Sequence, residues 1–255
     1  MKERTLFVVL GHGAPEAFTT TIKLWQRAAG EGCLLLVHGG KLRDFEALDY
    51  GDKVWVDDPR LRTRSHPVER QSYCGAWREV ARWVESRNFD AVYWAEFDEL
   101  PLVAELGSRL TEIMSLEKAD VLARRLKRVD GTNDAHWLYH EKEQSFREVF
   151  EKVSCRDNPR IVLSMLGTGS LWKRKAFLEV AEHPEGEPCY LELFLPTMAH
   201  HLGYRVRDFG EQSRFIGFDP KSNDELLEEI RAGAWTVHPV KGVEQERFVA
   251  EVAGL

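Results

Sequence analysis

The sequence predicts an α/β fold with three layers, in which a mostly parallel central sheet is flanked by helices. Two observations predict it. Short apolar runs alternate with amphipathic helical stretches, and each of the first four apolar runs ends beside glycine or acidic residues. These runs are also uninterrupted by polar residues, which is typical of parallel strands that are covered on both faces. At 255 residues, we expect a single domain over 1–255.

Residue spacing sets the expected elements. In the first part of the chain, strands are expected over Thr5–Leu10, Cys33–Val37, Lys53–Val56 and Asp90–Ala95, and helices over Ala17–Ala29 and Ser72–Val84. In the second part, strands are expected over Val121–Arg125, Arg160–Ser164 and Trp235–Val237, and helices over Lys142–Val153, Leu171–Val180, Tyr190–Leu202 and Ser222–Ala232. The last helix begins with a capping box formed by Ser222 and Glu225.

Composition and charge exclude several classes of protein. The chain has 35 Lys and Arg against 42 Asp and Glu, a net charge of −7, so we expect no nucleic-acid partner. No apolar run approaches the roughly 18 residues that span a bilayer, and the N-terminal run is too short for a signal peptide, so we expect no integral membrane segment. The four cysteines form no CxxC pair, which favours free thiols in a reducing, cytoplasmic location.

Several common catalytic motifs are absent from the sequence. There is no P-loop and no GxSxG nucleophile elbow. Gly11 and Gly13 are followed by Glu16 where a dinucleotide fingerprint needs its third glycine. His136 and His140 are four residues apart, but without an HExxH pattern the spacing does not favour a zinc site.

Ligands of open parallel sheets bind beyond the carboxyl ends of the strands, so the residues after each expected strand are the candidate site. These residues are Gly11, His12 and Gly13; His38, Gly39 and Gly40; Asp57 and Asp58; and Glu96, Phe97 and Asp98. Glu96 and Asp98 are two positions apart and share a face of an extended segment, so both can reach one divalent ion. Hard carboxylate oxygens suit Mg²⁺ or Mn²⁺, although an acidic loop at a strand end is the ordinary alternative.

Three later segments add to this pattern. Gly167–Phe177 is a glycine turn followed by a basic helix start. Glu192 lies eleven residues before the Gly203–Val206 segment (GYRV). The segment Trp235–Gly242 contains His238 and Lys241.

The order of these motifs resembles the GT-A fold of nucleotide-sugar-dependent glycosyltransferases, with features of the family 2-like enzymes. The resemblance spans most of the chain and rests on pattern and order. It implies a nucleotide-binding half over 1–100 and an acceptor-binding half over 101–255. It also implies that a nucleoside-diphosphate sugar, with UDP or GDP, donates a hexose to a carbohydrate or another hydroxyl acceptor.

The resemblance also implies roles for individual residues. Glu96 and Asp98 occupy the place of the family's DxD motif, and His238 is similar to its late metal ligand, which implies Mn²⁺ or Mg²⁺. Glu replaces the first Asp, and some members of the fold work without metal by placing basic residues on the diphosphate. Glu192 occupies the place of the catalytic base of inverting members, with Leu191 where the preceding acid belongs. Lys241 would contact phosphate, and the glycine segment before the basic helix would line the donor and acceptor site.

The resemblance and the strand-end positions place the nucleotide against the first half of the chain. Gly11, His12 and Gly13 would allow close backbone approach. Asp57 or Asp58 would accept a hydrogen bond from the base. Three tryptophans lie near the motifs and could stack on sugar, although burial in the core is the commoner role of tryptophan. They are Trp94, Trp172 and Trp235.

Two alternatives to a glycosyltransferase stay open. A nucleotidyltransferase uses a similar sheet, but such enzymes usually carry Arg and Lys after the first strand, where this chain has Gly11–Pro15 (GHGAP). A catalytically degenerate relative would bind a nucleotide or a protein without turnover. The departures at Glu96 and Leu191 keep that alternative open.

Overall fold

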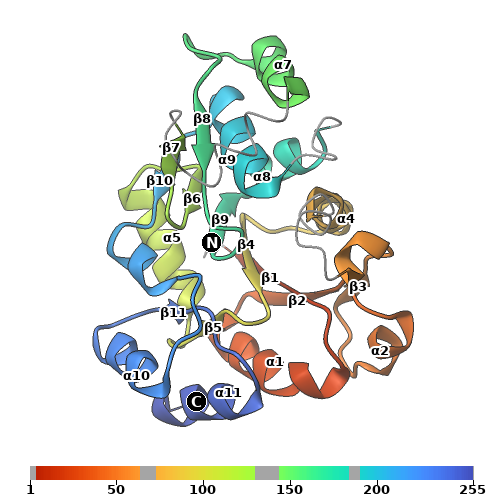
Figure 1. Cartoon of the computed structure of the whole chain (residues 1–255), viewed down its shortest axis with the longest axis vertical. Coiled ribbons are helices and arrows are strands. Elements are labelled where there is room, and N and C mark those ends of the chain that lie inside the picture. Colours follow the sequence, from red (N-terminus) through yellow and green to blue (C-terminus); the bar gives the residue numbers. More distant parts are fainter. Residues whose placement is uncertain (1–3, 64–72, 130–143, 184–189, 255) are drawn as a thin grey trace.

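The computed structural model describes residues 4–63, 73–129, 144–183 and 190–254 (Figure 1). Its centre is a seven-stranded sheet with the strand order β10-β6-β9-β4-β1-β2-β3. The strands of this sheet are β1 (Thr5–Gly11), β2 (Cys33–His38), β3 (Lys53–Trp55), β4 (Ala91–Glu96), β6 (Val121–Ala123), β9 (Ser170–Lys173) and β10 (Val206–Asp208). Strand β9 is antiparallel to both β4 and β6, and the other neighbouring strands are parallel. Strands β1, β2, β3, β4, β6 and β10 therefore all run in one direction.

Two smaller antiparallel pairs accompany the main sheet. They are β5 (Leu100–Pro101) with β11 (Thr236–Val237), and β7 (Lys127–Val129) with β8 (Val162–Ser164). The first pair joins the segment after β4 to the C-terminal part of the chain. It thereby brings two regions together that are far apart in the sequence.

Helices cover both faces of the sheet. They are α1 (Pro15–Ala29), α2 (Leu42–Ala47), α4 (Tyr73–Glu85), α5 (Leu106–Leu116), α7 (Gln144–Val153), α8 (Arg174–Ala181), α9 (Leu191–His201), α10 (Asn223–Arg231) and α11 (Val243–Val252). Two short 3₁₀ helices, η1 (Pro59–Arg62) and η4 (Gly210–Phe215), lie in loops. The Ser222 and Glu225 capping box at the start of α10 is present. No helix within the described ranges is long and apolar enough to cross a membrane.

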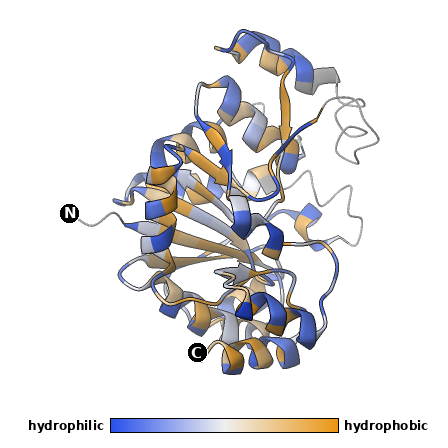
Figure 2. Ribbon diagram, turned by 90° about the vertical axis from the view of Figure 1, so that its left-hand side faces the viewer, coloured by the Kyte–Doolittle hydropathy of each residue, from blue (hydrophilic) through white to orange (hydrophobic). Residues whose placement is uncertain are grey.

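Strand β1 shows how the sequence builds the layers. All seven of its residues are buried, and alternate side chains point to opposite faces of the sheet. Leu6, Val8 and Leu10 join the core beneath α4, α8 and α9, whereas Phe7 and Val9 join the core beneath α1 and α5. Figure 2 shows hydrophobic residues along the central strands, and hydrophobic and hydrophilic residues in turn along the helices.

Tryptophans fill the core beneath α4. The ring of Trp77 lies 4.8 Å from that of Trp94 and 5.0 Å from that of Trp172, and all three side chains are fully buried. Burial in the core is therefore the role of Trp94 and Trp172, and their rings are not exposed for stacking on a sugar. A third core cluster lies under α10 and α11 and includes Leu226 and Val249.

The α/β fold and its mostly parallel sheet are confirmed, with one correction in the second half. We expected a helix over Leu171–Val180, but residues 171–173 belong to β9 and the helix begins at Arg174. Leu171 and Trp172 pair with both β4 and β6, so burial between two strands overrides their helical spacing. His136, His140 and the first residues of two expected helices, Ser72 and Lys142, lie outside the described residues.

Candidate active site

The loops that follow the parallel strands meet at one edge of the main sheet. The Gly39 N–H donates to the carbonyl of Gly11 at 2.9 Å, which joins the loops after β1 and β2. The Phe97 N–H donates to the carbonyl of Leu10 at 2.8 Å, which joins the loops after β1 and β4. The expected strand-end residues are therefore neighbours in space. Glu96 is the last residue of β4, the middle strand of the seven-stranded sheet.

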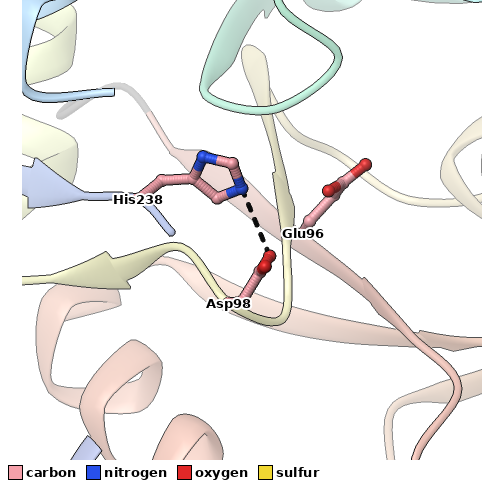
Figure 3. Close-up of side chains that lie close together, drawn as sticks. All are labelled: Glu96, Asp98 and His238. Carbon is pink, nitrogen blue, oxygen red and sulfur yellow. Dashed lines mark ion pairs between the residues drawn. The ribbon is translucent and has the colours of Figure 1, made fainter. Parts of the chain in front are cut away.

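An acidic pair and a histidine meet at this edge (Figure 3). One ligand atom from each of Glu96, Asp98 and His238 lies within 4.8 Å of the others. The Nε2 atom of His238 lies 3.4 Å from Oδ1 of Asp98. Glu96 ends β4 and Asp98 follows it, whereas His238 follows β11, and the β5–β11 pairing joins these regions. The structure thus assembles three of the expected residues from two distant segments.

The second nitrogen of His238 orients its ring. Nδ1 lies 2.8 Å from the carbonyl oxygen of Gly217. A carbonyl only accepts hydrogen bonds, so Nδ1 carries the proton, and in the neutral ring Nε2 presents a lone pair towards Asp98. Metal-binding histidines are commonly held in this way by a hydrogen bond from the other nitrogen.

Burial and the charges within the cluster shift the pKa values of the three groups in different directions. Burial raises the pKa of Glu96 to about 7, and the negative charge of Asp98 adds to the rise. Burial also acts to raise the pKa of Asp98, but the neighbouring His238 and Lys241 outweigh it and lower that pKa. Burial acts to lower the pKa of His238, but the charges of the two acids outweigh it and raise that pKa. Near neutral pH, Asp98 is therefore ionised, whereas Glu96 is partly protonated.

The donor set fits a divalent cation. The Asp98 side chain is only 4% exposed, and its Oδ1 atom accepts no hydrogen bond from the described residues. Buried carboxylate oxygens need a partner, and two carboxylates with one imidazole are suitable ligands for Mn²⁺. The other oxygen, Oδ2, accepts a hydrogen bond from the Nζ atom of Lys241, whose side chain is 56% exposed. Lys241 thus adds a positive charge to the cluster from a side chain with room to move.

A buried polar framework lies behind the acidic pair. The Thr168 hydroxyl accepts from the Glu96 N–H at 2.8 Å and donates to Oε2 of Glu99 at 2.6 Å. The Tyr93 hydroxyl donates to Oε1 of Glu99 at 2.6 Å. Glu99 is fully buried, so both of its oxygens are satisfied from inside the protein.

Arg124 completes this framework on the side of β11. It is also fully buried, and its Nη2 donates to the Thr236 hydroxyl at 3.2 Å. A Cβ added to Gly169 would stand 2.9 Å from Cγ of Arg124 and 3.2 Å from Oε2 of Glu99, and Gly169 has φ +72°. Only a glycine therefore lets the two buried charged residues approach one another at this turn.

Glu192 lies in the first turn of α9 and faces the same framework. Its Oε1 accepts from the Gly167 N–H at 2.8 Å, and its Oε2 accepts from the Tyr190 hydroxyl. Its negative charge contributes to raising the pKa of Glu96. Glu192 and Glu96 are therefore linked through the Gly167–Thr168 turn. Leu191, where the resemblance expects an acid, is buried in the core.

The glycines after β1 and β2 serve internal packing first. A Cβ on Gly11 would stand 2.7 Å from the ring of Phe18, and one on Gly40 would stand 2.7 Å from the carbonyl oxygen of His12. His38 joins the two loops, because its Nδ1 accepts from the Gly40 N–H and its Nε2 therefore donates to the Gly13 carbonyl at 3.0 Å. His12 itself is exposed, and its ring meets that of Phe97 edge-on.

The two acids after β3 differ in availability. Asp58 caps η1, and both of its oxygens bind the guanidinium of Arg60. Burial acts to raise the pKa of Asp58, but Arg60 outweighs it and lowers that pKa. The Asp57 side chain is 65% exposed and pairs with Arg62 through Oδ1 at 2.8 Å. Asp57 is thus the better placed of the two for a ligand.

The basic helix start does not reach the site, contrary to the expectation. Lys173 pairs with Ala91 at the first residue of β4, so it lies at the opposite end of that strand from Glu96. Its Nζ pairs with Asp120 at 2.9 Å. Arg174 donates to the Glu85 carbonyl at 3.1 Å. Only the Gly167–Ser170 part of the segment belongs to the site, because β9 carries the chain away from it.

Sequence reasoning missed three residues of the site, namely Glu99, Thr168 and Arg124. A buried acid looks like a solvated one in a sequence, and Glu99 directly follows the acidic motif. Thr168 lies within the glycine turn that begins at Gly167. A pair of arginines at a strand end, Arg124 and Arg125, was the one signal available for the third residue.

No family model and no curated protein matches the chain. A bifunctional glycosyltransferase, WbbM, matches 99% of this chain with 12% identity and a TM-score of 0.50, and the chain spans half of that protein's length. The chain has a GT-A fold. The galactosyltransferase LgtC, solved with donor and acceptor sugar analogues, matches 98% of this chain and 95% of its own, with 14% identity and a TM-score of 0.47. A mannosyltransferase from Pyrobaculum calidifontis, solved with GDP-Man and Mn²⁺, matches 99% of this chain and 70% of its own, with 11% identity and a TM-score of 0.44. Nucleotidyltransferases are also among the matching structures.

The raised pKa of Glu96 predicts that Glu96→Gln stabilises the metal-free protein at alkaline pH. Between its ordinary pKa of 4.5 and about 7, the folded state binds more protons than the unfolded state, so stability falls as pH rises through this window. Above about pH 7, the ionised Glu96 therefore destabilises the folded state by its full amount. At roughly 1.4 kcal/mol per pKa unit, discounted for partial exposure, we expect E96Q to gain about 2 kcal/mol at pH 8. Thermal unfolding in chelator measures this gain, which should disappear near pH 4.5.

Asp98→Asn is the matched control for this prediction. The pKa of Asp98 is lowered by its positive neighbours, so Asp98 is ionised and stabilising in the folded protein. Removing its charge leaves His238 and Lys241 without this counter-ion and should lower the melting temperature at pH 8. Equal melting temperatures of wild type and E96Q at pH 8 would contradict the account of Glu96.

The contact of Lys241 with Asp98 predicts that Lys241→Met binds Mn²⁺ more tightly in the absence of nucleotide. Removing one positive charge next to the ligand oxygens should raise the affinity by about tenfold. The free Mn²⁺ signal in electron paramagnetic resonance measures this affinity. Lys173→Met is the control, because its side chain has a similar exposure of 48% at the opposite end of β4. Unchanged Mn²⁺ affinity in K241M would show that Lys241 does not act on the cation.

Proposed function

We propose that the chain is a glycosyltransferase, which moves a sugar from a UDP- or GDP-sugar to an acceptor hydroxyl. The observation that carries the proposal is the meeting of Glu96, Asp98 and His238 at the carboxyl edge of a GT-A sheet. These residues come from segments about 140 positions apart in the sequence.

The acidic edge is suited to the diphosphate of the donor. Glu96, Asp98 and His238 would hold Mn²⁺ or Mg²⁺, which when bound neutralises charge on the leaving diphosphate. Lys241 has an exposed side chain and can contribute a second positive charge to the phosphates. The base and ribose are assigned to the ends of β1 to β3, where exposed His12 and Asp57 offer polar groups and Gly11 and Gly13 keep the loop compact.

Glu192 is assigned the role of catalytic base. Its Oε1 is held by the Gly167 N–H, and the Tyr190 hydroxyl holds Oε2, so the carboxylate is fixed in place. It accepts the proton of the acceptor hydroxyl while the acceptor oxygen forms its bond to the anomeric carbon of the sugar. The bond between that carbon and the diphosphate breaks, and the diphosphate leaves with the electron pair. Attack from the side opposite the leaving group inverts the anomeric centre.

We expect one nucleoside diphosphate to raise the melting temperature by several degrees at millimolar concentration. Ligand that binds only the native state stabilises it by mass action. A panel of UDP, GDP, CDP, ADP and dTDP, each with and without Mn²⁺, measures the shift and names the base. The metal-dependent part should be absent in Asp98→Asn.

The outcomes of this panel, together with assays of donor turnover and pyrophosphate release, separate the alternatives. A shift that does not depend on metal would move the phosphate contacts to Lys and Arg side chains. Binding without turnover of any sugar donor would indicate a degenerate relative, and release of pyrophosphate from a nucleoside triphosphate and a sugar phosphate would indicate a nucleotidyltransferase. The proposal is wrong if no diphosphate shifts the folded protein.

Glu192→Gln should lower kcat for sugar transfer by about 100-fold or more, because general bases contribute that much to catalysis. Gln retains an oxygen for the Gly167 N–H, so we expect diphosphate binding within about twofold of wild type. Steady-state transfer and the thermal shift measure the two effects. Glu228→Gln, on the exposed face of α10, is the control. An unchanged kcat in E192Q would remove Glu192 from the mechanism.

A further inference from the structure

An exposed aromatic ring lies beside the metal-binding cluster. Phe218 is 60% exposed, and within the described ranges it is the one aromatic side chain among the exposed large hydrophobics. The others are Leu42, Leu116, Val243 and Val252. Burying a phenylalanine side chain contributes about 1.5–3 kcal/mol, so the folded chain forgoes that stabilisation at Phe218.

The backbone next to Phe218 is tied to His238. The Gly217 N–H donates to the His238 carbonyl at 3.0 Å, and the Gly217 carbonyl accepts from Nδ1 of His238 at 2.8 Å. A parallel bridge also joins Ile216 to His238. Phe218 therefore directly follows Gly217, the residue whose backbone is hydrogen-bonded to His238.

Arg125 supports the ring from the end of β6. Its guanidinium lies 5.2 Å from the centre of the Phe218 ring, and its Nε donates to the Ile216 carbonyl at 2.6 Å. Its backbone adopts φ +50°, and its N–H donates to the Ser213 hydroxyl at 3.3 Å. The other described non-glycine residues with positive φ, Glu105 and Lys118, flank helix α5, whereas Arg125 flanks no helix. Strained backbone of this kind is concentrated at functional sites.

The strand order places this pair on the acceptor side. Glu96 ends β4, the strands of the proposed nucleotide site (β1, β2 and β3) lie on one side of β4, and β6 and β10 lie on the other. Arg125 follows β6, so the pair flanks the metal-binding cluster from the side that the nucleotide does not use.

We propose that Phe218 and Arg125 form a platform for a sugar ring of the acceptor. The face of a pyranose presents C–H groups that pack on an aromatic ring, and its hydroxyls accept hydrogen bonds from a guanidinium. The platform holds the acceptor sugar beside His238, where its hydroxyl can meet the donor. The assignment rests on the proposed glycosyltransferase function, which places the donor at the other side of Glu96.

Saturation-transfer NMR tests the platform directly. The probes are methyl α- and β-glycosides of glucose, galactose and mannose at 10–20 mM, a range chosen for weak ligands, with the protein in Mg²⁺ and the diphosphate from the thermal panel. We expect wild type to transfer saturation to at least one glycoside, and Phe218→Ala to weaken the transfer by about fivefold to tenfold. Phe218→Trp should retain it. Leu116→Ala is the control, because Leu116 is 74% exposed on α5, away from the site.

Each outcome decides between the platform and the proposed function. Wild-type contact with a glycoside that F218A loses, and that L116A and F218W retain, supports the platform. No contact with any glycoside, or equal contact in F218A and wild type, overturns it. Weaker diphosphate binding in F218A also overturns it, because the ring would then serve the donor. Failure of every diphosphate to bind, with glycoside contact intact, would instead reject the glycosyltransferase function and leave a sugar-binding surface.

Discussion

The hydroxyl of Thr168 is the contact on which the candidate site depends. It accepts from the backbone of Glu96 and donates to Glu99, so one side chain fixes the end of β4 to the turn before β9. The same turn donates the Gly167 N–H to Glu192. Glu96 of the candidate metal site and the proposed base Glu192 are therefore held by the adjacent residues Thr168 and Gly167. Their relative position depends on this turn.

Compensation of buried negative charge explains why distant segments converge here. The run from Glu96 to Glu99 places three carboxyl groups at a buried strand end, and unpaired charges there would cost several kcal/mol each. Asp98 is met by His238 and Lys241 from the C-terminal part of the chain. Glu99 is met by Thr168 and Tyr93, with Arg124 nearby across Gly169. Because these groups must be paired, four segments of the chain meet at one edge of the sheet. The same contacts bring the residues of the candidate site together.

In the proposed function, the sheet would also separate the two substrates. The antiparallel strand β9 stands between β4 and β6, so the loops after β1 to β3 lie on one side of the acidic cluster and the loops after β6 and β10 on the other. On the side proposed for the nucleotide, His38 and the small residues Gly11 and Gly40 keep the loops packed together. On the other side, the Phe218 and Arg125 pair stands open to solvent. A transferase needs such an arrangement, because donor and acceptor must approach a common point from different directions.

The local sequence pattern was sufficient to predict the fold class and part of the candidate site. The alternation of apolar runs and amphipathic stretches determined the α/β class, and strand ends pointed to Glu96, Asp98 and the glycines because direction alone places them at one edge. Tertiary structure decided the rest. Residues 171–173 have helical spacing yet form β9, because pairing with two strands outweighs local preference. Lys173 and Arg174 leave the site because that strand runs antiparallel. Arg124 reaches Thr236 across 112 positions of sequence, and Asp98 reaches Lys241 across 143, and spacing cannot report contacts of that range.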